Sequence, residues 1–279
     1  CRSRSPDAKA MRARLALAAL LALALPAEAQ TDPRAEAREA LLFGDHSDGL
    51  RRIMMFAEAG EADAEALVGV AYFEGLGVDR DAEEAASWFR RAAEHGSAAA
   101  QSTLASFYYG GQGVDEDHAE AAKWYLKAAE QGASRAAFVL GALYANGDGV
   151  GQDFIAAARW YRAAADAGIA GAQASLGQLL LTGAGLAEDH AEAAAWFKKA
   201  ADQGNVPAMA SLGRAYRAGD GVRKDIVAAA VWLSLAAERG YTGAGDEVAA
   251  LVKEMTPAQI QAAARSAATW VPKLATQTR

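Results

Sequence analysis

Apolar and small residues recur along this chain with a period of 36 residues. In the first part of each period, apolar positions are spaced by four, which places them on one face of a helix. In the second part, alanines flank a tryptophan and a second large side chain. The tryptophans that mark the period are Trp88, Trp124, Trp160, Trp196 and Trp232. The pattern predicts stacked helix pairs, since units this short bury enough apolar surface only against their neighbours.

A glycine motif separates the two predicted helices of each unit. The motif G-x-G-V/L-x-x-D occurs five times, first from Gly75 to Asp81 and last from Gly219 to Asp225. A phosphate-binding loop would need a third glycine where Arg80 and its equivalents stand, as well as a preceding strand. The motif therefore predicts a turn. Its glycines end the first helix in left-handed conformations, and its aspartate caps the second helix.

Other small residues indicate where helices end and where they approach each other. Gly96 and its equivalents close each unit and predict the end of the second helix. Gly69 and its equivalents fall inside the first helix, where glycine costs about 1 kcal/mol relative to alanine. We expect a neighbouring helix to pack closely at these positions.

The repeat divides the chain into four regions. Residues 61–240 form five full units, and residues 30–60 form a short loose leader, through residue 33, followed by a degenerate capping repeat with Arg52 in the tryptophan column. Residues 241–279 are expected to form C-terminal capping helices and a tail. Within this region, Thr256 begins a strong helix that should extend to about Trp270.

Residues 1–29 have the features of a secretory leader. Met11 is the expected start, and basic residues, an apolar run from Leu15 to Leu25 and an A-x-A site ending at Ala29 follow it. The apolar run is shorter than the roughly 20 residues that span a bilayer. We therefore expect a cleaved signal peptide, no stable membrane insertion afterwards, and a periplasmic or secreted protein of bacterial origin.

Composition excludes several classes of function. The net charge is -7, with no basic segment interleaved with aromatics, which disfavours nucleic acid as a partner. The single cysteine, Cys1, excludes a disulfide framework.

The repeated pattern closely resembles the Sel-one-like repeat, a relative of the tetratricopeptide. Its consensus here is A-x-x-x-L-G-x-x-Y-x-x-G-x-G-V-x-x-D-x-x-x-A-x-x-W-Y/F-x-x-A-A-x-x-G, over residues 61–240. The resemblance implies an all-α, right-handed αα-superhelix with a concave face lined by the first helices. It also implies an adaptor role, and secreted bacterial members are associated with envelope signalling and exopolysaccharide systems. Some cysteine-rich members are linked to β-lactam binding or hydrolysis, which gives an alternative function for this fold.

Two charged segments are candidates for a metal site or an acid-base catalytic site. Glu116-Asp117-His118 and Glu188-Asp189-His190 place carboxylates beside an imidazole, as metal or acid-base sites do. Their positions after the glycine motif instead favour helix caps with exposed histidines. The two segments also lie two units apart, too far to share one ligand. We therefore expect no enzyme and no catalytic, cofactor or metal site.

The binding surface is expected at the variable positions of the first helices. Alignment with the tetratricopeptide assigns the columns of residues 66, 70 and 73 to the concave face. The predicted partner-binding residues are Phe73, Tyr109, Phe138, Gln178, Leu181, Arg214 and Arg217. An apolar strip with arginines at one end suits a protein or peptide that carries an acidic group, and the aromatics could also bind glycan. The alternative is that the aromatics only pack between neighbouring first helices.

Overall fold

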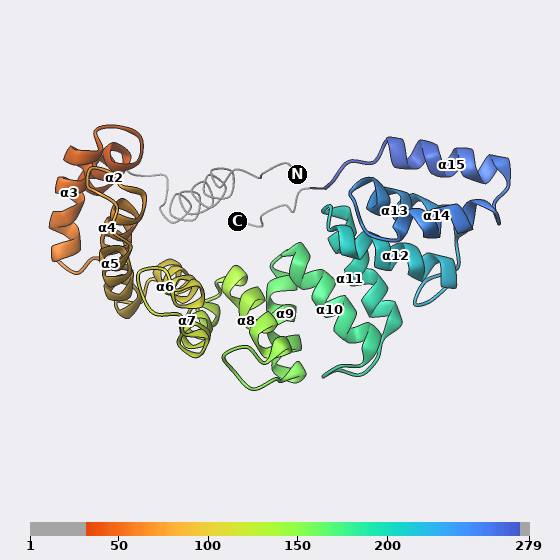
Figure 1. Ribbon diagram of the computed structural model, residues 1–279, viewed down its shortest axis with the longest axis horizontal. Coiled ribbons are helices and arrows are strands. Elements are labelled where there is room, and N and C mark those ends of the chain that lie inside the picture. The colour runs from red at the N-terminus through yellow and green to blue at the C-terminus, as the bar shows by residue number, and fades with distance from the viewer. Residues whose placement is uncertain (1–31, 274–279) are drawn as a thin grey trace. The chain divides into compact units, whose positions relative to one another are not determined.

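The computed structural model describes residues 32–273 (Figure 1). This part of the chain has fourteen helices and no strand. The expected signal peptide, Cys1 and the last residues of the tail lie outside the described residues. The described chain forms two compact units, which divide between Ala136 and Ala137.

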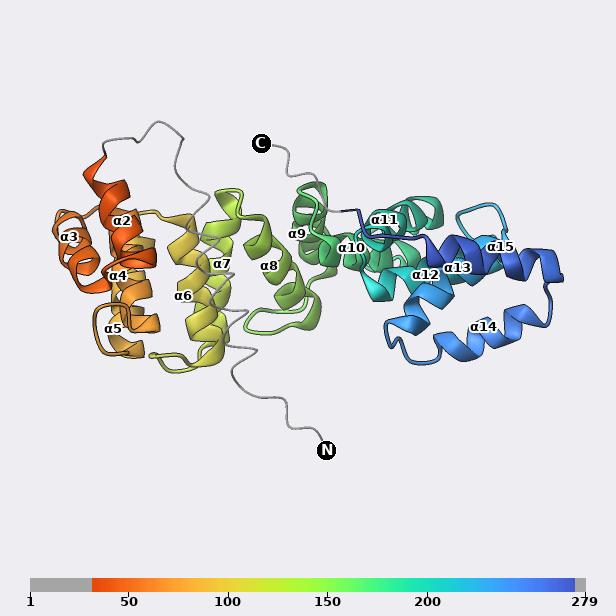
Figure 2. The ribbon, with the colours of Figure 1, turned by 90° about the horizontal axis from the view of Figure 1, so that it is seen from above.

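The predicted helix pairs are confirmed. Within each of the two compact units, consecutive helices run side by side as antiparallel pairs (Figures 1 and 2). The helices are α2 (Pro33–Phe43), α3 (His46–Glu58), α4 (Ala62–Glu74), α5 (Ala82–Glu94), α6 (Ala98–Gly110), α7 (His118–Glu130), α8 (Ser134–Asn146), α9 (Phe154–Asp166), α10 (Ala170–Thr182), α11 (His190–Asp202), α12 (Val206–Ala218), α13 (Ile226–Glu238), α14 (Ala244–Val252) and α15 (Pro257–Ala268). Helices α4 to α13 are the ten helices of the five repeats.

The glycine motif is a turn followed by a helix cap, as predicted. Gly75 ends α4 in the left-handed region, with φ 76°, and its backbone N–H donates to the Ala71 carbonyl oxygen. The Asp81 side chain then accepts hydrogen bonds from the first turn of α5. The same cap is formed by Asp117, Asp153, Asp189 and Asp225.

The second glycine of the motif has a further role, in joining one repeat to the next. A Cβ placed on Gly221 would overlap the carbonyl oxygen of His190, at the start of α11 in the preceding repeat. Gly113 stands in the same relation to Ala82, at the start of α5. In these two repeats, the loop therefore lies directly against the first turn of the second helix of the preceding repeat, and this contact leaves no room for a side chain.

The glycines inside the first helices mark a close approach, as expected. A Cβ on Gly69 would lie 3.1 Å from the ring of Phe89 on α5, and one on Gly177 would lie 2.9 Å from the ring of Phe197 on α11. The neighbour is thus the second helix of the same repeat, whose large side chain fills the space left by the glycine.

A buried polar position on the first helices also links the two helices of a repeat. Glu65 is fully buried, and its carboxylate lies 2.7 Å from His95 Nδ1 and 2.9 Å from Arg91 Nη2. One repeat later Gln101 occupies the same position and accepts a 2.8 Å hydrogen bond from Gln131. Each buried polar group is therefore matched by a partner 30 residues later.

The N-terminal cap forms a complete helix pair. Leu41 of α2 and Ile53 of α3 pack into one cluster with Val68 of α4, which covers the first full repeat. Residue 33, predicted to end a loose leader, belongs instead to a helix. Helix α2 already begins at Pro33, because the Asp32 side chain accepts the backbone N–H of Arg34 and proline suits the first helical turn.

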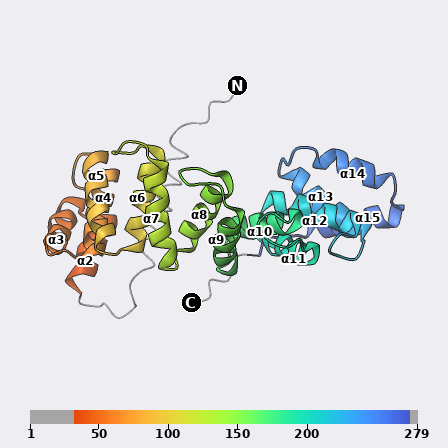
Figure 3. The ribbon, with the colours of Figure 1, turned by 90° about the horizontal axis from the view of Figure 1, so that it is seen from below.

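The C-terminal cap confirms the predicted helix start. Thr256 and Gln259 form a capping box, and α15 extends to Ala268. Helices α14 and α15 lie beside α13 (Figure 3). Trp270 then packs edge-on against Trp232, with ring centroids 6.1 Å apart. This contact covers the last tryptophan of the repeat.

Among residues 32–273, no helix has the length and apolar character needed to cross a membrane.

Candidate partner-binding site

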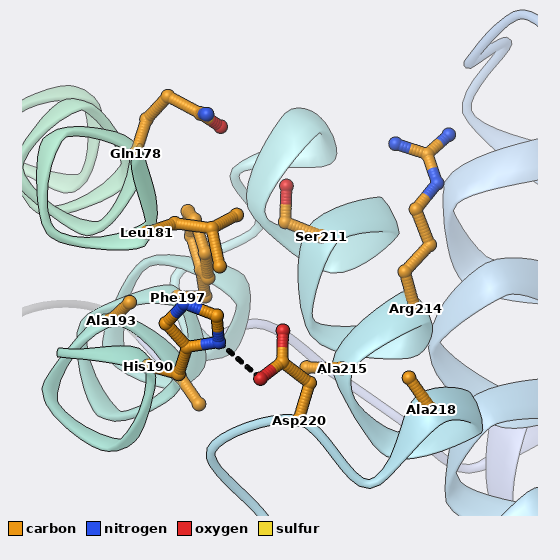
Figure 4. A pocket seen from close by; sticks show the side chains of 11 residues that line it. Gln178, Leu181, His190, Ala193, Phe197, Ser211, Arg214, Ala215, Ala218 and Asp220 are labelled. Carbon is orange, nitrogen blue, oxygen red and sulfur yellow. Dashed lines mark hydrogen bonds and ion pairs between the residues drawn. The ribbon is translucent and has the colours of Figure 1, made fainter. Parts of the chain in front are cut away.

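A pocket opens between α10, α11 and α12 of the second unit and has a volume of about 370 Å³. Gln178 and Leu181 reach it from α10, and Ser211 and Arg214 from α12 (Figure 4). We call this space the α10–α12 pocket. Three residues predicted from the variable columns, Gln178, Leu181 and Arg214, thus line one pocket although they belong to two repeats.

Apolar side chains form much of the pocket wall. Leu181 is half-buried and lies in Figure 4 beside Phe197, which is 3% exposed. The rest of this wall is alanine: Ala193, Ala194, Ala215 and Ala218. Alanine is frequent here because the helices pack closely. The small side chains leave a hydrocarbon-lined space beside the exposed Gln178.

A histidine with two carboxylate partners borders the pocket. His190 is the first residue of α11, and its Nδ1 contacts Asp220, in the glycine loop of the next repeat (Figure 4). Its Nε2 contacts Glu188, just before the helix. Hydrogen bonds to Asp220 and then to Glu188 raise the pKa of His190, since both carboxylates favour the charged imidazole.

The arginine of the pocket is held by the C-terminal cap. Arg214 Nη2 lies 2.6 Å from Glu247 Oε1 on α14, and Arg214 Nε also lies 3.1 Å from each carboxylate oxygen. The Arg214 guanidinium also lies over the Tyr241 ring, 5.5 Å from its centroid. The hydrogen bond to Glu247 raises the pKa of Arg214 further above its usual range.

The second predicted arginine has a similar partner. Arg217 Nη2 lies 3.4 Å from Glu254 Oε1, just beyond α14. The sequence pattern assigned Arg214 and Arg217 to an acidic ligand, whereas the structure pairs both with carboxylates of the same chain. The two arginines therefore contribute little uncompensated positive charge.

The predicted aromatic residues lie in different surroundings. Phe73 packs against Phe107 of α6, with ring centroids 5.1 Å apart, and Phe138 packs 5.9 Å from the ring of Tyr161. For these two, the structure agrees with packing between helices. Tyr109 is 41% exposed and stacks on His118, with centroids 4.3 Å apart.

No group of three or more metal-ligating side chains within residues 32–273 is arranged to hold a metal ion. His118 and His190 are both first-turn residues behind capping aspartates, as the sequence suggested, but both are half-buried rather than exposed.

Comparison with known protein families agrees with this architecture. A model of the Sel1 repeat family matches residues 62–97, 98–132, 134–169, 170–205 and 206–241, which make up more than half of the chain. The chain belongs to the Sel1 repeat family. No curated protein matches it.

Solved structures include other Sel1 repeat proteins. A Sel1 repeat protein from Oxalobacter formigenes is 29% identical, with a TM-score of 0.70, over 84% of this chain and 97% of that one. A protective antigen of uropathogenic Escherichia coli is 26% identical over 85% of this chain and 68% of that one, with a TM-score of 0.41. The first of these supports the αα-solenoid fold of this Sel1 repeat protein.

Two elements of the site escaped the sequence-based prediction. The contact of His190 with Asp220 joins residues 30 positions apart in adjacent repeats of the Sel1 repeat protein. A signal for it was present, because His118 and Asp148 stand at the same spacing. Glu247 had no such signal, since it lies beyond the last regular repeat.

Proposed function

We propose that this Sel1 repeat protein is a non-catalytic scaffold that binds a segment of a partner protein in the α10–α12 pocket. The observation that carries the proposal is the convergence of Gln178, Leu181 and Arg214 on one concave, partly apolar space. Gln178 and Leu181 stand at positions that vary between repeats, so the repeated packing does not dictate them, whereas Arg214 is held by Glu247 of the C-terminal cap. A pocket with apolar walls and a few polar groups is the usual form of a ligand site.

The surroundings of His190 support binding rather than hydrolysis. Ser211 lines the same pocket, and a serine hydrolase would need a histidine nitrogen to accept the serine proton. Both ring nitrogens of His190 instead contact carboxylates, from Asp220 and Glu188. This arrangement favours the charged form of the imidazole and engages both of its nitrogens, unlike a histidine that accepts a proton from a serine.

The proposed place of action is the periplasm or the outside of a bacterial cell, in envelope signalling or exopolysaccharide regulation. The support is the leader-like sequence from Met11 to Ala29. Mass spectrometry of the protein purified from cells tests the location. A mature N-terminus at Gln30 in the exported fraction is expected, and an uncleaved chain retained in the cytoplasm contradicts export.

Selection from a displayed library of random peptides tests the binding function. Peptides recovered on the wild-type protein are remeasured by calorimetry on Leu181→Asp, which places a charge in the apolar wall, and on the milder Leu181→Ala. Met55→Asp is the matched control, because Met55 is 68% exposed on α3. Thermal melts of each variant verify folding.

We expect Leu181→Asp to abolish binding, Leu181→Ala to weaken it about tenfold or less, and Met55→Asp to leave it unchanged. The proposal is overturned if no peptide binds above background, or if the recovered peptides bind the folded Leu181 variants as tightly as the wild type.

A further inference from the structure

The charge of the α10–α12 pocket differs from the charge that the sequence suggested. Arg214 is the one arginine or lysine among its lining residues, and its guanidinium is directed away from the His190–Asp220 contact in Figure 4. Glu247 binds that guanidinium at two points. An acidic ligand group would have to compete with Glu247 for this cation, so Arg214 offers it little attraction.

The uncompensated charge around His190 is negative, with Asp220 in the pocket lining and Glu188 outside it. Asp220 and Glu188 both contact His190, and one imidazole carries at most one positive charge against their two negative charges. The side chain of Asp220 is 38% exposed and that of Glu188 is 60% exposed, so solvent and ligands reach both. Each carboxylate has several lone-pair positions, and its contact with the imidazole uses only part of this capacity.

Apolar surface lies beside Asp220. Leu181, Phe197 and the alanines of α11 and α12 give the pocket a hydrocarbon wall, while Gln178 and Ser211 add neutral polar groups. Lysine and arginine carry long methylene stems that pack against apolar surface while their charged ends stay with polar groups. A pocket that combines an apolar wall with the exposed carboxylate of Asp220 can hold both parts of such a side chain.

We propose that the α10–α12 pocket binds a lysine or arginine side chain of the partner segment, with its stem against Leu181 and Phe197 and its charged end at Asp220. This inference rests on the proposed binding function and specifies the chemistry of the partner. The net charge of -7 acts in the same direction, because it attracts a basic partner over longer distances.

Short blocked peptides that differ only at one central residue test this inference. The central residue is lysine, arginine, glutamate or norleucine, and the flanking residues come from the peptides selected on the wild-type protein. Norleucine is the essential comparison, since it keeps the lysine stem and lacks the charge. Calorimetry on the full chain gives each affinity.

Two charge variants and their matched controls show whether the preference for a basic residue arises in the α10–α12 pocket. Asp220→Asn removes one carboxylate from the pocket, while Asp115→Asn makes the same change on an exposed loop of the first unit. Gln178→Lys adds a positive charge at the exposed pocket edge, and Gln178→Met adds similar bulk without charge. Neither Asp220 nor Gln178 belongs to the buried core, and thermal melts verify folding.

We expect the lysine and arginine peptides to bind about three- to tenfold more tightly than the norleucine peptide, and the glutamate peptide to bind most weakly. Asp220→Asn and Gln178→Lys should remove most of this preference, while Asp115→Asn and Gln178→Met preserve it.

Equal affinity for lysine and norleucine peptides, or a preference for glutamate, overturns this inference and leaves the binding function intact. A preference for lysine that persists in Asp220→Asn and Gln178→Lys places the basic group elsewhere and also overturns it. Failure of every peptide to bind contradicts the binding function itself.

Discussion

Arg214 on α12 and Glu247 on α14 form a two-point ion pair, with Nη2 2.6 Å and Nε 3.1 Å from the carboxylate. The pair connects the last full repeat to the C-terminal cap. It also neutralises the positive charge that the sequence pattern assigned to binding an acidic ligand. An exchange of Arg214 for glutamate would therefore disturb the cap as well as any binding surface.

A double-mutant cycle of Arg214→Ala and Glu247→Ala measures this connection. Both side chains are partly exposed, so we expect a coupling free energy of about 0.5–1 kcal/mol in urea unfolding. High salt should reduce it, because solvent-accessible charges are screened. A coupling near zero at low salt would show that the cap does not depend on this pair.

The second glycine of the repeat motif should be far less replaceable than the glycine that closes a repeat. Gly221 has φ 66° and lies against the His190 carbonyl, whereas Gly240 has φ 82° and open space, with no atom beyond its own chain neighbours within 4 Å of the position that a Cβ would take. We expect Gly240→Ala to cost about 1–2 kcal/mol, the strain of the left-handed conformation. Gly221→Ala should cost about 1–3 kcal/mol more through overpacking. Equal losses in chemical denaturation would argue against the inter-repeat contact.

The buried partners Glu65 and His95 should behave as one unit. His95→Gln leaves the fully buried carboxylate with Arg91 as its remaining close cation, so we expect a clear loss of stability. Adding Glu65→Gln reproduces the Gln101–Gln131 pair of the next repeat and should recover about 1 kcal/mol or more. If the double variant is no more stable than His95→Gln, residues 65 and 95 do not contribute to stability as a matched pair.

Stability should fall with rising pH in one window because of His190. Its pKa is raised in the folded protein by Asp220 first and then by Glu188. The resulting stabilisation is complete below about pH 6.5, the unfolded value, and disappears as the pH rises through the folded-state pKa. NMR titration of the His190 ring, with urea midpoints across this range, measures both effects. Asp220→Asn should lower the pKa and shrink the slope, and an unchanged titration contradicts the contact.

Binding of a basic peptide should respond to pH in the opposite sense. Protonated His190 compensates part of the charge on Asp220 and Glu188, while Arg214 faces Glu247. Loss of the imidazole proton leaves the two carboxylates more strongly negative. We therefore expect lysine peptides to bind more tightly as the pH rises through the His190 titration, with norleucine peptides unaffected. Calorimetry at several pH values would detect the reverse trend, which would contradict this account.

The fold followed from the sequence because the same packing problem is solved five times. The same residue types recur at a fixed spacing, as Trp124, Asp117 and the glycines show. Each recurrence indicates that the residue has the same structural role in every helix pair. The site could be predicted only in part. Variable columns identified Gln178 and Leu181, but they could not show that Arg214 meets Glu247, which lies in a region without the repeat.

The aromatic columns show a second limit of sequence reasoning. Phe73 and Tyr109 occupy equivalent positions, yet Phe73 packs on Phe107 while Tyr109 is exposed and stacks on His118. The difference depends on residues of the neighbouring helices, such as Phe107, which are not part of the column. A column identifies which residues share a face, and the neighbouring helix decides which of them remain accessible.

The most direct test of the central claim is an NMR titration of the wild-type protein with the tightest lysine-centred peptide and its norleucine analogue. The account predicts that backbone and side-chain amide shifts concentrate at Gln178, Leu181, His190 and Asp220, and that the lysine peptide saturates them at a lower concentration. Shifts centred on other helices, or equal saturation by the two peptides, would contradict it.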